Sequence, residues 1–155
     1  TWKLCPTMKA EDVKTTLDDA LIVADLKNNN PPKLLSDNGS CYISHELADY
    51  LKEKDMKHVR GRPMHPQTQG KIERYHRSMK NVVKLDNYFS PGQLEEKLKE
   101  FVQYYNYERY HKAIKNLTPA EVYYGKGEQK LKQRQMIKNK TLKARKKQYQ
   151  KFNLN

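Results

Sequence analysis

The sequence contains few of the residues that build a large apolar core. Leu, Ile, Val and Phe together number 30 of 155 residues, about 19 %, which is the border at which a strongly charged chain can be disordered. Eleven Tyr add to the apolar inventory, so one small core is possible, and the length fits a single domain. Long apolar runs are also lacking. The longest, Ala20–Ala24, is far below the ~18 residues of a membrane-spanning helix, so we expect no membrane partner.

Cysteine is scarce. Cys5 and Cys41 are the only two, and they lack paired spacing, which argues against a disulfide framework and against a zinc ribbon. A reducing compartment fits this low cysteine usage best. The printed sequence shows neither an initiator Met nor a charged-then-apolar leader, so we expect no secretory signal.

Acidic residues are nearly absent from the last fifth of the chain. Residues 1–125 carry 20 basic and 17 acidic groups, whereas residues 126–155 carry 11 basic groups and only Glu128, a net charge of +10. Clustered Lys and Arg displace condensed counterions from nucleic acid, so this basic tail indicates a phosphate-binding arm. A solvated tail that only aids solubility is the alternative. The tail has no Gly or Pro after Gly127, which allows a basic helix.

Apolar periodicity predicts helices and short strands before a loop at residues 61–66. Apolar residues at helical spacing predict a helix over about residues 9–27, and Ser44 can cap a second helix over about residues 45–54. Short apolar runs predict strands, and a turn follows the second of them. These segments are the strands at Thr1–Leu4, Leu34–Leu35 and Met56–Val59 and the turn at Asp37–Ser40.

Three more helices are predicted after this loop. A long one covers about Gln67 to Leu85, and Ser90 and Thr118 each begin a capping sequence with Pro at the first helical position. The helix after Ser90 has an apolar inner face, formed by Leu94, Leu98, Phe101, Val102 and Tyr105. Short strands alternating with helices and then followed by helices predict an α/β layer fold.

Two carboxylates lie at positions suited to chemistry. Asp37 follows an apolar strand, and α/β folds usually place their sites at the carboxyl ends of sheet strands. Glu73 lies on the long helix, with 35 residues between the two carboxylates. Helical spacing places Glu73 on one face with Gln69, Arg77 and Lys80. The adjacent face is apolar and predicts packing on the sheet through Ile72, Tyr75, Met79 and Val83.

A carboxylate among cations is unusual on a surface that only binds phosphate. Five cations surround Glu73 on this helix, namely Lys71, Arg74, Arg77, Lys80 and Lys84. The arrangement is explained if Asp37 and Glu73 hold Mg²⁺, because Mg²⁺ prefers a few carboxylates, and paired ions can activate water and stabilise a leaving oxygen. The alternative is that Asp37 is an ordinary turn residue and that Glu73 pairs with Arg77.

Several blocks of the sequence follow one another in a recognisable order. They are Leu34-Leu35-Ser36-Asp37-Asn38-Gly39-Ser40, then His65-Pro66-Gln67-Thr68-Gln69-Gly70-Lys71-Ile72-Glu73-Arg74, then Lys80, and further on Tyr105-Asn106, Arg109, His111 and Thr118–Tyr123. Together these blocks resemble the catalytic core of insertion-sequence transposases. These transposases belong with the retroviral integrases in the DDE recombinase superfamily, which has a ribonuclease-H-like fold. The 35-residue separation matches the second and third acidic residues of that family, and the resemblance covers most of residues 1–125.

The resemblance implies metal-dependent phosphoryl transfer on DNA. Asp37 and Glu73 would be the catalytic carboxylates and would bind Mg²⁺ or Mn²⁺, while Asn38 and His65 would support the loop or the substrate. Together with the basic residues singled out by charge, the expected DNA contacts are Gln69, Lys71, Arg74, Arg77, Lys80, Lys84, Lys143, Arg145, Lys146 and Lys147. The expected partners are double-stranded DNA, as transposon ends and target, and further copies of the chain in a synaptic complex. The expected location is the bacterial cytoplasm, at the nucleoid.

The resemblance is incomplete at the start of the chain. The family uses three carboxylates, and the first lies on its opening strand, whereas Thr1–Leu4 here matches the third strand. The following helix, which is the wrong element to replace that strand, carries Asp12, Asp18, Asp19 and Asp25. We therefore expect a core without its first two strands, with an exposed sheet edge and no strand transfer by itself. The predicted domains are a partial catalytic core at 1–125 and a basic helical tail at 126–155.

Two other functions are open at this stage. The chain could be a non-catalytic nucleic-acid-binding module that uses the tail and the Lys71–Lys84 helix, or a basic structural protein of an assembly. The tyrosines of Tyr104-Tyr105-Asn106-Tyr107 and Tyr110 could stack on unpaired bases. The favoured interpretation is that Tyr105 faces the core and that the others are half-buried residues of the helix surface. The five His lack metal-type spacing, which argues against a zinc site.

Overall fold

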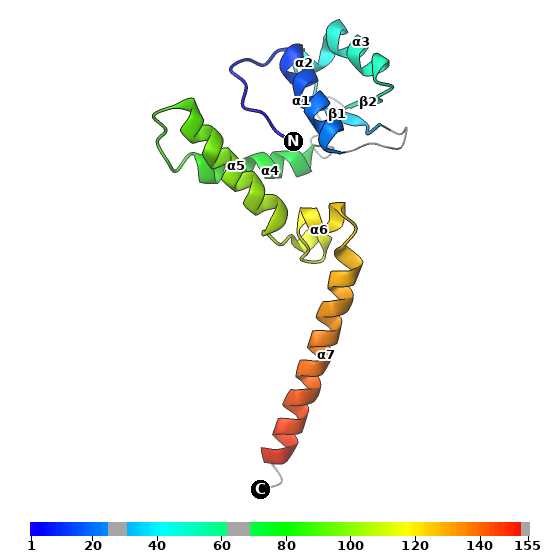
Figure 1. The fold of residues 1–155 in the computed structure, drawn as a ribbon, viewed down its shortest axis with the longest axis vertical. Helices are drawn as coiled ribbons and strands as arrows, with labels where there is room; N and C mark the ends of the chain where they lie inside the picture. The colour runs from blue at the N-terminus through cyan, green and yellow to red at the C-terminus, as the bar shows by residue number, and fades with distance from the viewer. Residues whose placement is uncertain (25–30, 62–68, 153–155) are drawn as a thin grey trace. The chain divides into compact units, whose positions relative to one another are not determined.

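The computed structural model describes residues 1–24, 31–61 and 69–152 (Figure 1). Backbone contacts divide the chain into two compact units, Thr1–Asp86 and Asn87–Asn155. Each unit buries its own small set of apolar residues.

The first unit begins with helix α1 (Ala10–Val23), which lies within the helix predicted over residues 9–27. Asp12 is the third residue of this helix. Its carboxylate accepts a hydrogen bond from the hydroxyl of Thr7 and another, of 3.0 Å, from the backbone N–H of Lys9. These two hydrogen bonds lower the pKa of Asp12. A carboxylate in the first turn also complements the partial positive charge of the helix start, so the local sequence explains where α1 begins.

Two helices connect the strands of the first unit. The short α2 (Ser40–Ile43) was not predicted, whereas α3 (His45–Glu53) confirms the helix predicted after Ser44. The hydroxyl of Ser44 accepts the N–H of Leu47 at 3.2 Å, which is the capping bond expected of Ser at this position.

The two strands β1 (Leu34–Ser36) and β2 (His58–Arg60) form a parallel sheet in which Leu35 lies opposite Val59. Parallel strands need a crossover connection, and α2 and α3 supply it. The prediction of a strand at Thr1–Leu4 is wrong, since the structure shows none there. A strand needs a neighbour for its ladder of hydrogen bonds, and within the described residues β1 and β2 pair only with each other.

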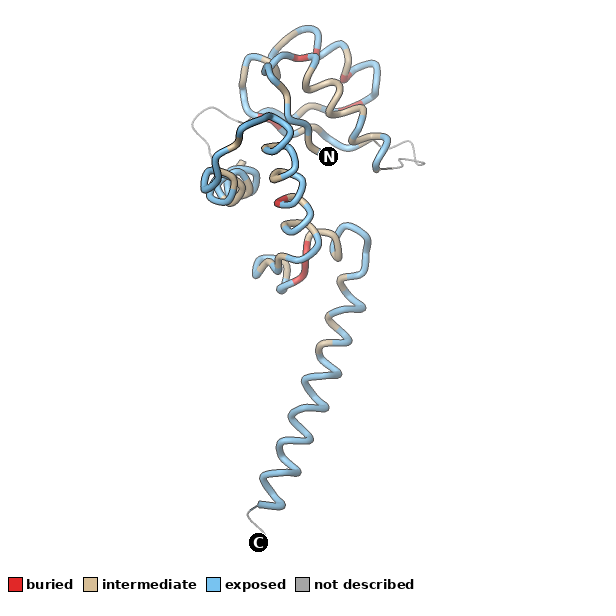
Figure 2. The backbone as a smooth tube through the Cα atoms, turned by 60° about the vertical axis from the view of Figure 1, so that its left-hand side comes forward, coloured by how far each residue is buried: buried red, intermediate tan, exposed pale blue. Residues whose placement is uncertain are grey.

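The core of the first unit lies between α1, α3 and one face of the sheet, and its buried residues are red in Figure 2. It consists of the buried Ala10, Leu47, Leu51 and Met56 and the partly buried Val13, Leu17, Leu21, Leu34, Tyr42 and Tyr50. Side chains alternate between the faces of a strand, so Leu35 and Val59 point away from this core. They are 49 % and 44 % exposed, which leaves the other face of the sheet open to solvent.

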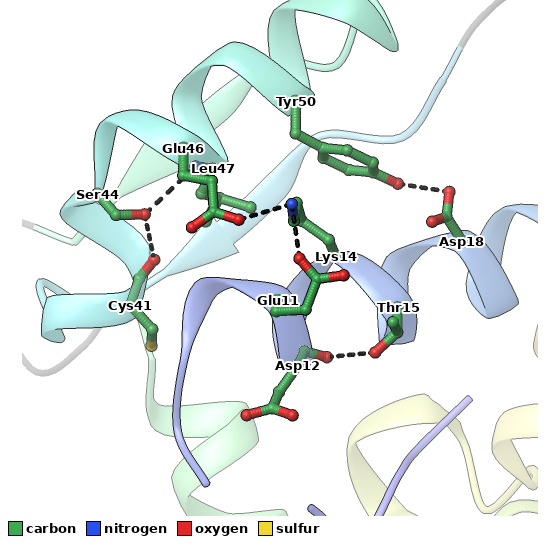
Figure 3. Close-up of polar contacts among 10 residues, drawn as sticks. All are labelled: Glu11, Asp12, Lys14, Thr15, Asp18, Cys41, Ser44, Glu46, Leu47 and Tyr50. Carbon is green, nitrogen blue, oxygen red and sulfur yellow. Dashed lines mark hydrogen bonds and ion pairs between the residues drawn. The ribbon is translucent and has the colours of Figure 1, made fainter.

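Polar contacts beside this core connect α1 to α3 (Figure 3). The ammonium of Lys14 lies 2.7 Å from both Glu11 and Glu46, and the hydroxyl of Tyr50 donates to Asp18 at 2.7 Å. The hydrogen bond and the charge of Lys14 lower the pKa of Glu46, while burial and the bond to Asp18 raise the pKa of Tyr50 to about 12. Because water reaches these groups, the contacts orient the two helices more than they stabilise them.

Helix α4 (Gly70–Val83) confirms the long helix predicted from Gln67, although residues 67 and 68 lie outside the described residues. Its apolar face does not pack as predicted. None of its residues is buried, Ile72 is 47 % exposed, and Tyr75 and Met79 are only half-buried. The physical reason is size, because two strands of three residues each cannot cover one face of a fourteen-residue helix.

The second unit begins with α5 (Pro91–Tyr107), which starts after Ser90 as predicted. The hydroxyl of Ser90 accepts the N–H of Gln93 at 3.4 Å. The side-chain carbonyl of Gln93 accepts a hydrogen bond from the N–H of Phe89 at 2.8 Å. The two hydrogen bonds of Gln93 therefore join Phe89 and Ser90 to the first turn of the helix.

The apolar face of α5 packs against the segment that follows it. Phe101 is buried, and the ring of Tyr105 lies 5.6 Å from the ring of Phe101 and 4.7 Å from that of His111. The guanidinium of Arg109 lies 5.3 Å from the Tyr105 ring, and the N–H of His111 donates to the carbonyl of Leu117 at 3.0 Å. The prediction that Tyr105 faces the core is confirmed.

A 3₁₀ turn, η2 (Lys112–Ile114), leads to the short α6 (Pro119–Tyr123). The capping sequence predicted at Thr118 is confirmed. The hydroxyl of Thr118 accepts a hydrogen bond from the N–H of Glu121 at 3.2 Å, and the Glu121 carboxylate accepts one from the N–H of Thr118 at 3.0 Å. Thr118 is buried, and Gly125, at φ +70°, follows the helix end in a conformation that favours glycine.

The basic tail is helical, as the sequence allowed. It forms α7 (Gly127–Phe152), whose first turns contact the rest of the unit through Lys130, 3.7 Å from the Glu121 carboxylate. From residue 135 to residue 152 every side chain is exposed, and Figure 2 shows this part in pale blue. None of the described helices combines the length and the apolar composition needed to cross a bilayer.

Candidate active site

Asp37 lies directly after β1, as predicted, and it is exposed. Its Oδ1 accepts the backbone N–H of Gly39 at 2.8 Å, so the carboxylate is oriented by the turn that contains it. A Cβ on Gly39 would lie only 3.0 Å from this oxygen. A side chain at position 39 would therefore crowd the Asp37 carboxylate, and glycine avoids that contact.

Ser36 and His58 hold the backbone that carries Asp37. The hydroxyl of Ser36 donates to the Asp37 carbonyl at 2.8 Å, and the same oxygen lies 2.8 Å from His58 Nε2. Since the hydroxyl hydrogen is used in the first bond, Nε2 must donate in the second, which assigns the proton of neutral His58 to Nε2. Burial, and then the charge of Arg60, lower the pKa of His58 and favour this neutral form.

Asn38 connects the ends of the two strands. Its side-chain N–H donates to the carbonyl of Gly61 at 2.9 Å, and the N–H of Gly61 donates to the carbonyl of Ser36, also at 2.9 Å. The side chain of Gln69 reaches the same place, because its Nε2 would lie 3.2 Å from a Cβ on Gly61. The structure therefore brings Asn38 and Gln69 to the backbone of one residue, Gly61, next to the Asp37 turn.

Glu73 lies one helical turn after Gln69, about 6 Å further along the axis of α4, and it is exposed. Its N–H donates to the carbonyl of Gln69 at 3.0 Å. The sequence also allowed an ion pair between Glu73 and Arg77. That pair is not formed within the described residues.

The Lys and Arg residues of α4 and the Lys that follows its last residue are all exposed, as a phosphate-binding face requires; they are Lys71, Arg74, Arg77, Lys80 and Lys84. The predicted supporting residue His65 lies outside the described residues. The four tail residues expected to contact DNA are exposed on α7, in the second unit; they are Lys143, Arg145, Lys146 and Lys147.

The donor chemistry of Asp37 and Glu73 fits Mg²⁺ or Mn²⁺. Both side chains are accessible carboxylates, and hard oxygen ligands of this kind suit either ion. The described ranges contain no group of three or more His, Cys, Asp or Glu that could surround a metal. Within the described ranges, Asp37 and Glu73 are therefore two candidate ligands that do not form part of a larger cluster.

The sequence did not identify Ser36 and His58 as residues that support Asp37. The signal was present in the strand register: His58 lies opposite Leu34, and Ser36, two positions further along β1, points to the same face of the sheet. Using it requires knowing that the strands pair, and a three-residue apolar run is too short to show that.

Two family models, each described as an integrase core domain, match residues 1–66 and 54–119. The chain therefore belongs to the integrase core domain family. Curated relatives agree. The chain is 37 % identical over 84 residues to the Pro-Pol polyprotein of feline foamy virus, covering 54 % of this chain and 7 % of that protein. It is 42 % identical over 53 residues to the Pol-related polyprotein of mouse intracisternal A-particle MIA14, covering 34 % and 6 %. The chain spans under a tenth of either relative.

Solved structures show the same fold. The catalytic core domain of BIV integrase superposes with a TM-score of 0.56 at 25 % identity, covering 83 % of this chain and 80 % of that one. A chain of the simian T-cell lymphotropic virus intasome, solved in complex with PP2A regulatory subunit B56 gamma, gives a TM-score of 0.64 at 18 % identity, covering 77 % and 41 %. The predicted ribonuclease-H-like integrase core fold is confirmed; among the described residues it is mostly helical, with two parallel strands.

Proposed function

We propose that this chain acts in metal-dependent phosphoryl transfer on DNA, the chemistry of strand cleavage and strand transfer in integration and transposition. The observation that carries the proposal is the placement of Asp37 in a chain whose family is the integrase core domain. Its carboxylate is exposed at the carboxyl end of a strand, and backbone hydrogen bonds fix the turn that holds it.

Asp37 and Glu73 would hold the metal. When bound, Mg²⁺ or Mn²⁺ activates a water or a 3′ hydroxyl and stabilises the leaving oxygen. The side chains of this chain orient the reactants. Asn38 and Gln69 meet at Gly61, and a Gln amide there can donate to a phosphate or a base edge while Asn38 keeps the turn closed.

DNA contact divides between two surfaces. Exposed cations on α4 surround Glu73, and they can neutralise the phosphates next to the reacting one. The tail helix adds phosphate contacts through Lys143, Arg145, Lys146 and Lys147. Two DNA ends need at least two copies of such a core, so we propose a homo-oligomer on DNA as the working state. Transposition in a bacterial cytoplasm is the setting we propose for it.

The printed residues supply two of the three carboxylates that the family uses. We therefore propose that the 155-residue chain by itself, mixed with Mg²⁺ and DNA ends, does not transfer strands. Purified chain that cleaves such DNA, with loss of cleavage in Glu73→Gln, would contradict this part of the proposal and leave metal binding intact.

Metal binding is the direct test, because its readout does not require activity. Titration with Mn²⁺ should broaden the NMR amide signals of Asn38 and Gly39 beyond those of the remaining residues of the first unit. Asp37→Asn and Glu73→Gln should each weaken this effect, since each removes one charged ligand.

The matched control is Glu53→Gln, which removes an exposed carboxylate from α3 and should leave the Mn²⁺ titration unchanged. Uniform broadening across the protein, or equal broadening in wild type and in Asp37→Asn, would show that these carboxylates do not form a metal site.

Non-catalytic nucleic-acid binding is the second candidate function, and α7 is the observation that favours it. Its residues 135–152 are exposed throughout, and they carry seven Lys and Arg and no Asp or Glu. Removing residues 138–155 spares the α7 contacts made by Lys130 and Arg134. The truncated chain should bind duplex DNA more weakly and with a shallower salt dependence. An unchanged salt slope would exclude α7 as the arm.

A further inference from the structure

Three exposed tyrosines of the second unit form one aromatic surface, which consists of Tyr107 at the end of α5 and Tyr123 and Tyr124 at the end of α6. Their exposed fractions are 49 %, 69 % and 56 %. Tyr104, one turn earlier on α5 and therefore on the same side of that helix, is 49 % exposed. We call Tyr107, Tyr123 and Tyr124 the tyrosine surface. It contrasts with Tyr105, whose ring packs against Phe101 and His111.

The side chains of the tyrosine surface lie beside one another. The Tyr124 side chain next to Tyr107 raises the pKa of Tyr107. The rings of Tyr123 and Tyr124 lie 5.1 Å apart, edge to face at 85°. Rings fixed before a ligand arrives lose less side-chain freedom on binding than free ones.

The backbone beneath the tyrosine surface is also fixed. The reciprocal hydrogen bonds of Thr118 and Glu121 begin α6, and Thr118 is buried. At the other end, the N–H of Lys126 donates to the Glu121 carbonyl at 2.8 Å, directly after Gly125. Tyr123 and Tyr124 therefore belong to a segment whose two ends are held by hydrogen bonds.

The cationic helix α7 is attached next to this segment. Lys130 lies 3.7 Å from the carboxylate of Glu121, which belongs to α6. Arg134 donates to the carbonyl of Asn116 at 2.7 Å, and its guanidinium lies 5.2 Å from the Tyr110 ring. These contacts place the start of α7 and the tyrosine surface in one compact unit.

We propose that the tyrosine surface binds unpaired bases of a nucleic-acid strand whose phosphates contact α7. Aromatic side chains stack on bases of any sequence, and a neighbouring positive groove or helix tracks the backbone. Charge decides the occupant. A second protein would more often require a surface depleted of Lys, whereas the unit that carries these tyrosines has 16 Lys and Arg against 6 Asp and Glu. This binding needs no metal and does not depend on Asp37 or Glu73.

The test uses the full chain in the presence of EDTA and three fluorescent ligands of equal phosphate count. They are an oligothymidylate of about 12 nucleotides, an abasic strand of the same length and a short duplex. The oligothymidylate should bind more tightly than the abasic strand. The double variant Tyr123→Ala/Tyr124→Ala should weaken its binding about tenfold and leave abasic binding unchanged, because only stacking is removed.

Two further variants test whether the loss of binding is due to the aromatic rings of the tyrosine surface. Tyr123→Phe/Tyr124→Phe keeps both ring faces and should retain most of the affinity for the oligothymidylate. Phe89→Ala removes an aromatic ring that is 92 % exposed in the same unit but outside the tyrosine surface, and it should change nothing.

Two outcomes would overturn the proposal. One is equal affinity of the wild-type chain for the oligothymidylate and the abasic strand. The other is self-association of the wild-type chain in sedimentation velocity that the double Ala variant abolishes, which would make the tyrosine surface an interface between copies. Because EDTA is present throughout, either outcome leaves the proposed metal site untouched, and failure of the Mn²⁺ titration leaves the tyrosine surface untouched.

Discussion

His58 Nε2 lies 2.8 Å from the hydroxyl of Ser36, and that hydroxyl in turn donates to the carbonyl of Asp37. A ring on β2 thus supports the backbone of the candidate catalytic carboxylate at the end of β1. The relationship joins the fold to the site, because the two strands must pair in the observed register for the contact to exist.

Removing the Ser36 hydroxyl should destabilise the first unit. Ser36 is 6 % exposed, and Ser36→Ala deletes the acceptor of His58 and the donor to Asp37, so we expect a loss of about 1–3 kcal/mol in urea unfolding. Ser78→Ala, which removes an exposed hydroxyl bonded to the Arg74 carbonyl, should cost less than about 0.5 kcal/mol. Equal losses in the two variants would show that Ser36 has no special role.

The same contact predicts a dependence of stability on pH. Burial lowers the pKa of His58 from the usual 6.5, so in acid the unfolded chain binds more protons than the folded one. The free energy of unfolding should therefore fall as the pH drops below about 6.5. His58→Gln should flatten this part of the curve in urea titrations across that range, whereas His45→Gln, at an exposed position, should leave it in place.

Gly39→Ala should disturb the candidate metal site with little effect on folding. The new Cβ would lie 3.0 Å from Asp37 Oδ1, while the backbone of Gly39, at φ −59°, accepts alanine without strain. We expect weaker Mn²⁺ binding by NMR broadening and an almost unchanged melting temperature. Gly70→Ala, where nothing lies within 4 Å, serves as the control and should bind Mn²⁺ as the wild type does.

Gly127→Ala should destabilise the second unit. Its Cβ would lie 2.9 Å from Cδ1 of Leu117, a buried side chain with little room to move, so we expect a cost of about 1–3 kcal/mol. The comparison is Gly92→Ala, whose Cβ would meet only the Ser90 hydroxyl at 3.8 Å. If thermal unfolding gives both variants the wild-type midpoint, α7 does not depend on this close approach.

Tyr50 predicts a loss of stability in alkali. Its pKa is raised to about 12, so between the ordinary value of 10.0 and about 12 the folded chain holds a proton that the unfolded chain has released. Stability should fall as the pH rises through this interval. Tyr50→Phe should remove that decline in thermal melts, while Tyr149→Phe, on the exposed part of α7, should keep it.

The elements that follow from local chemistry were predictable, and those that depend on partners were less so. Ser44, Ser90 and Thr118 mark helix starts because a side-chain oxygen satisfies free N–H groups within three residues. The apolar face of α4 was assigned to the sheet because a stripe of apolar residues shows that a helix has a partner face, not how large the partner is. Thr1–Leu4 failed as a strand for the same reason, since strand formation depends on a neighbour elsewhere in the chain.

The candidate site also has a part that the sequence could predict and a part that it could not. Asp37, Asn38, Gln69 and Glu73 could be named from the order and spacing of their motifs. Their support could not, because the contacts to Gly61 and His58 join segments more than twenty residues apart. Which backbone atom accepts an amide is a property of the folded chain.

Arg134 contacts the body of its unit through the carbonyl of Asn116 and the ring of Tyr110, and residues 135–152, up to the end of the described part of α7, form one exposed helix. Eighteen residues at 1.5 Å each give a length of about 27 Å. Duplex DNA rises 3.4 Å per base pair, so this length corresponds to about eight base pairs, somewhat less than one turn of the double helix. The exposed part of α7 is therefore long enough to lie along most of one DNA turn, and its fixed end is at Arg134.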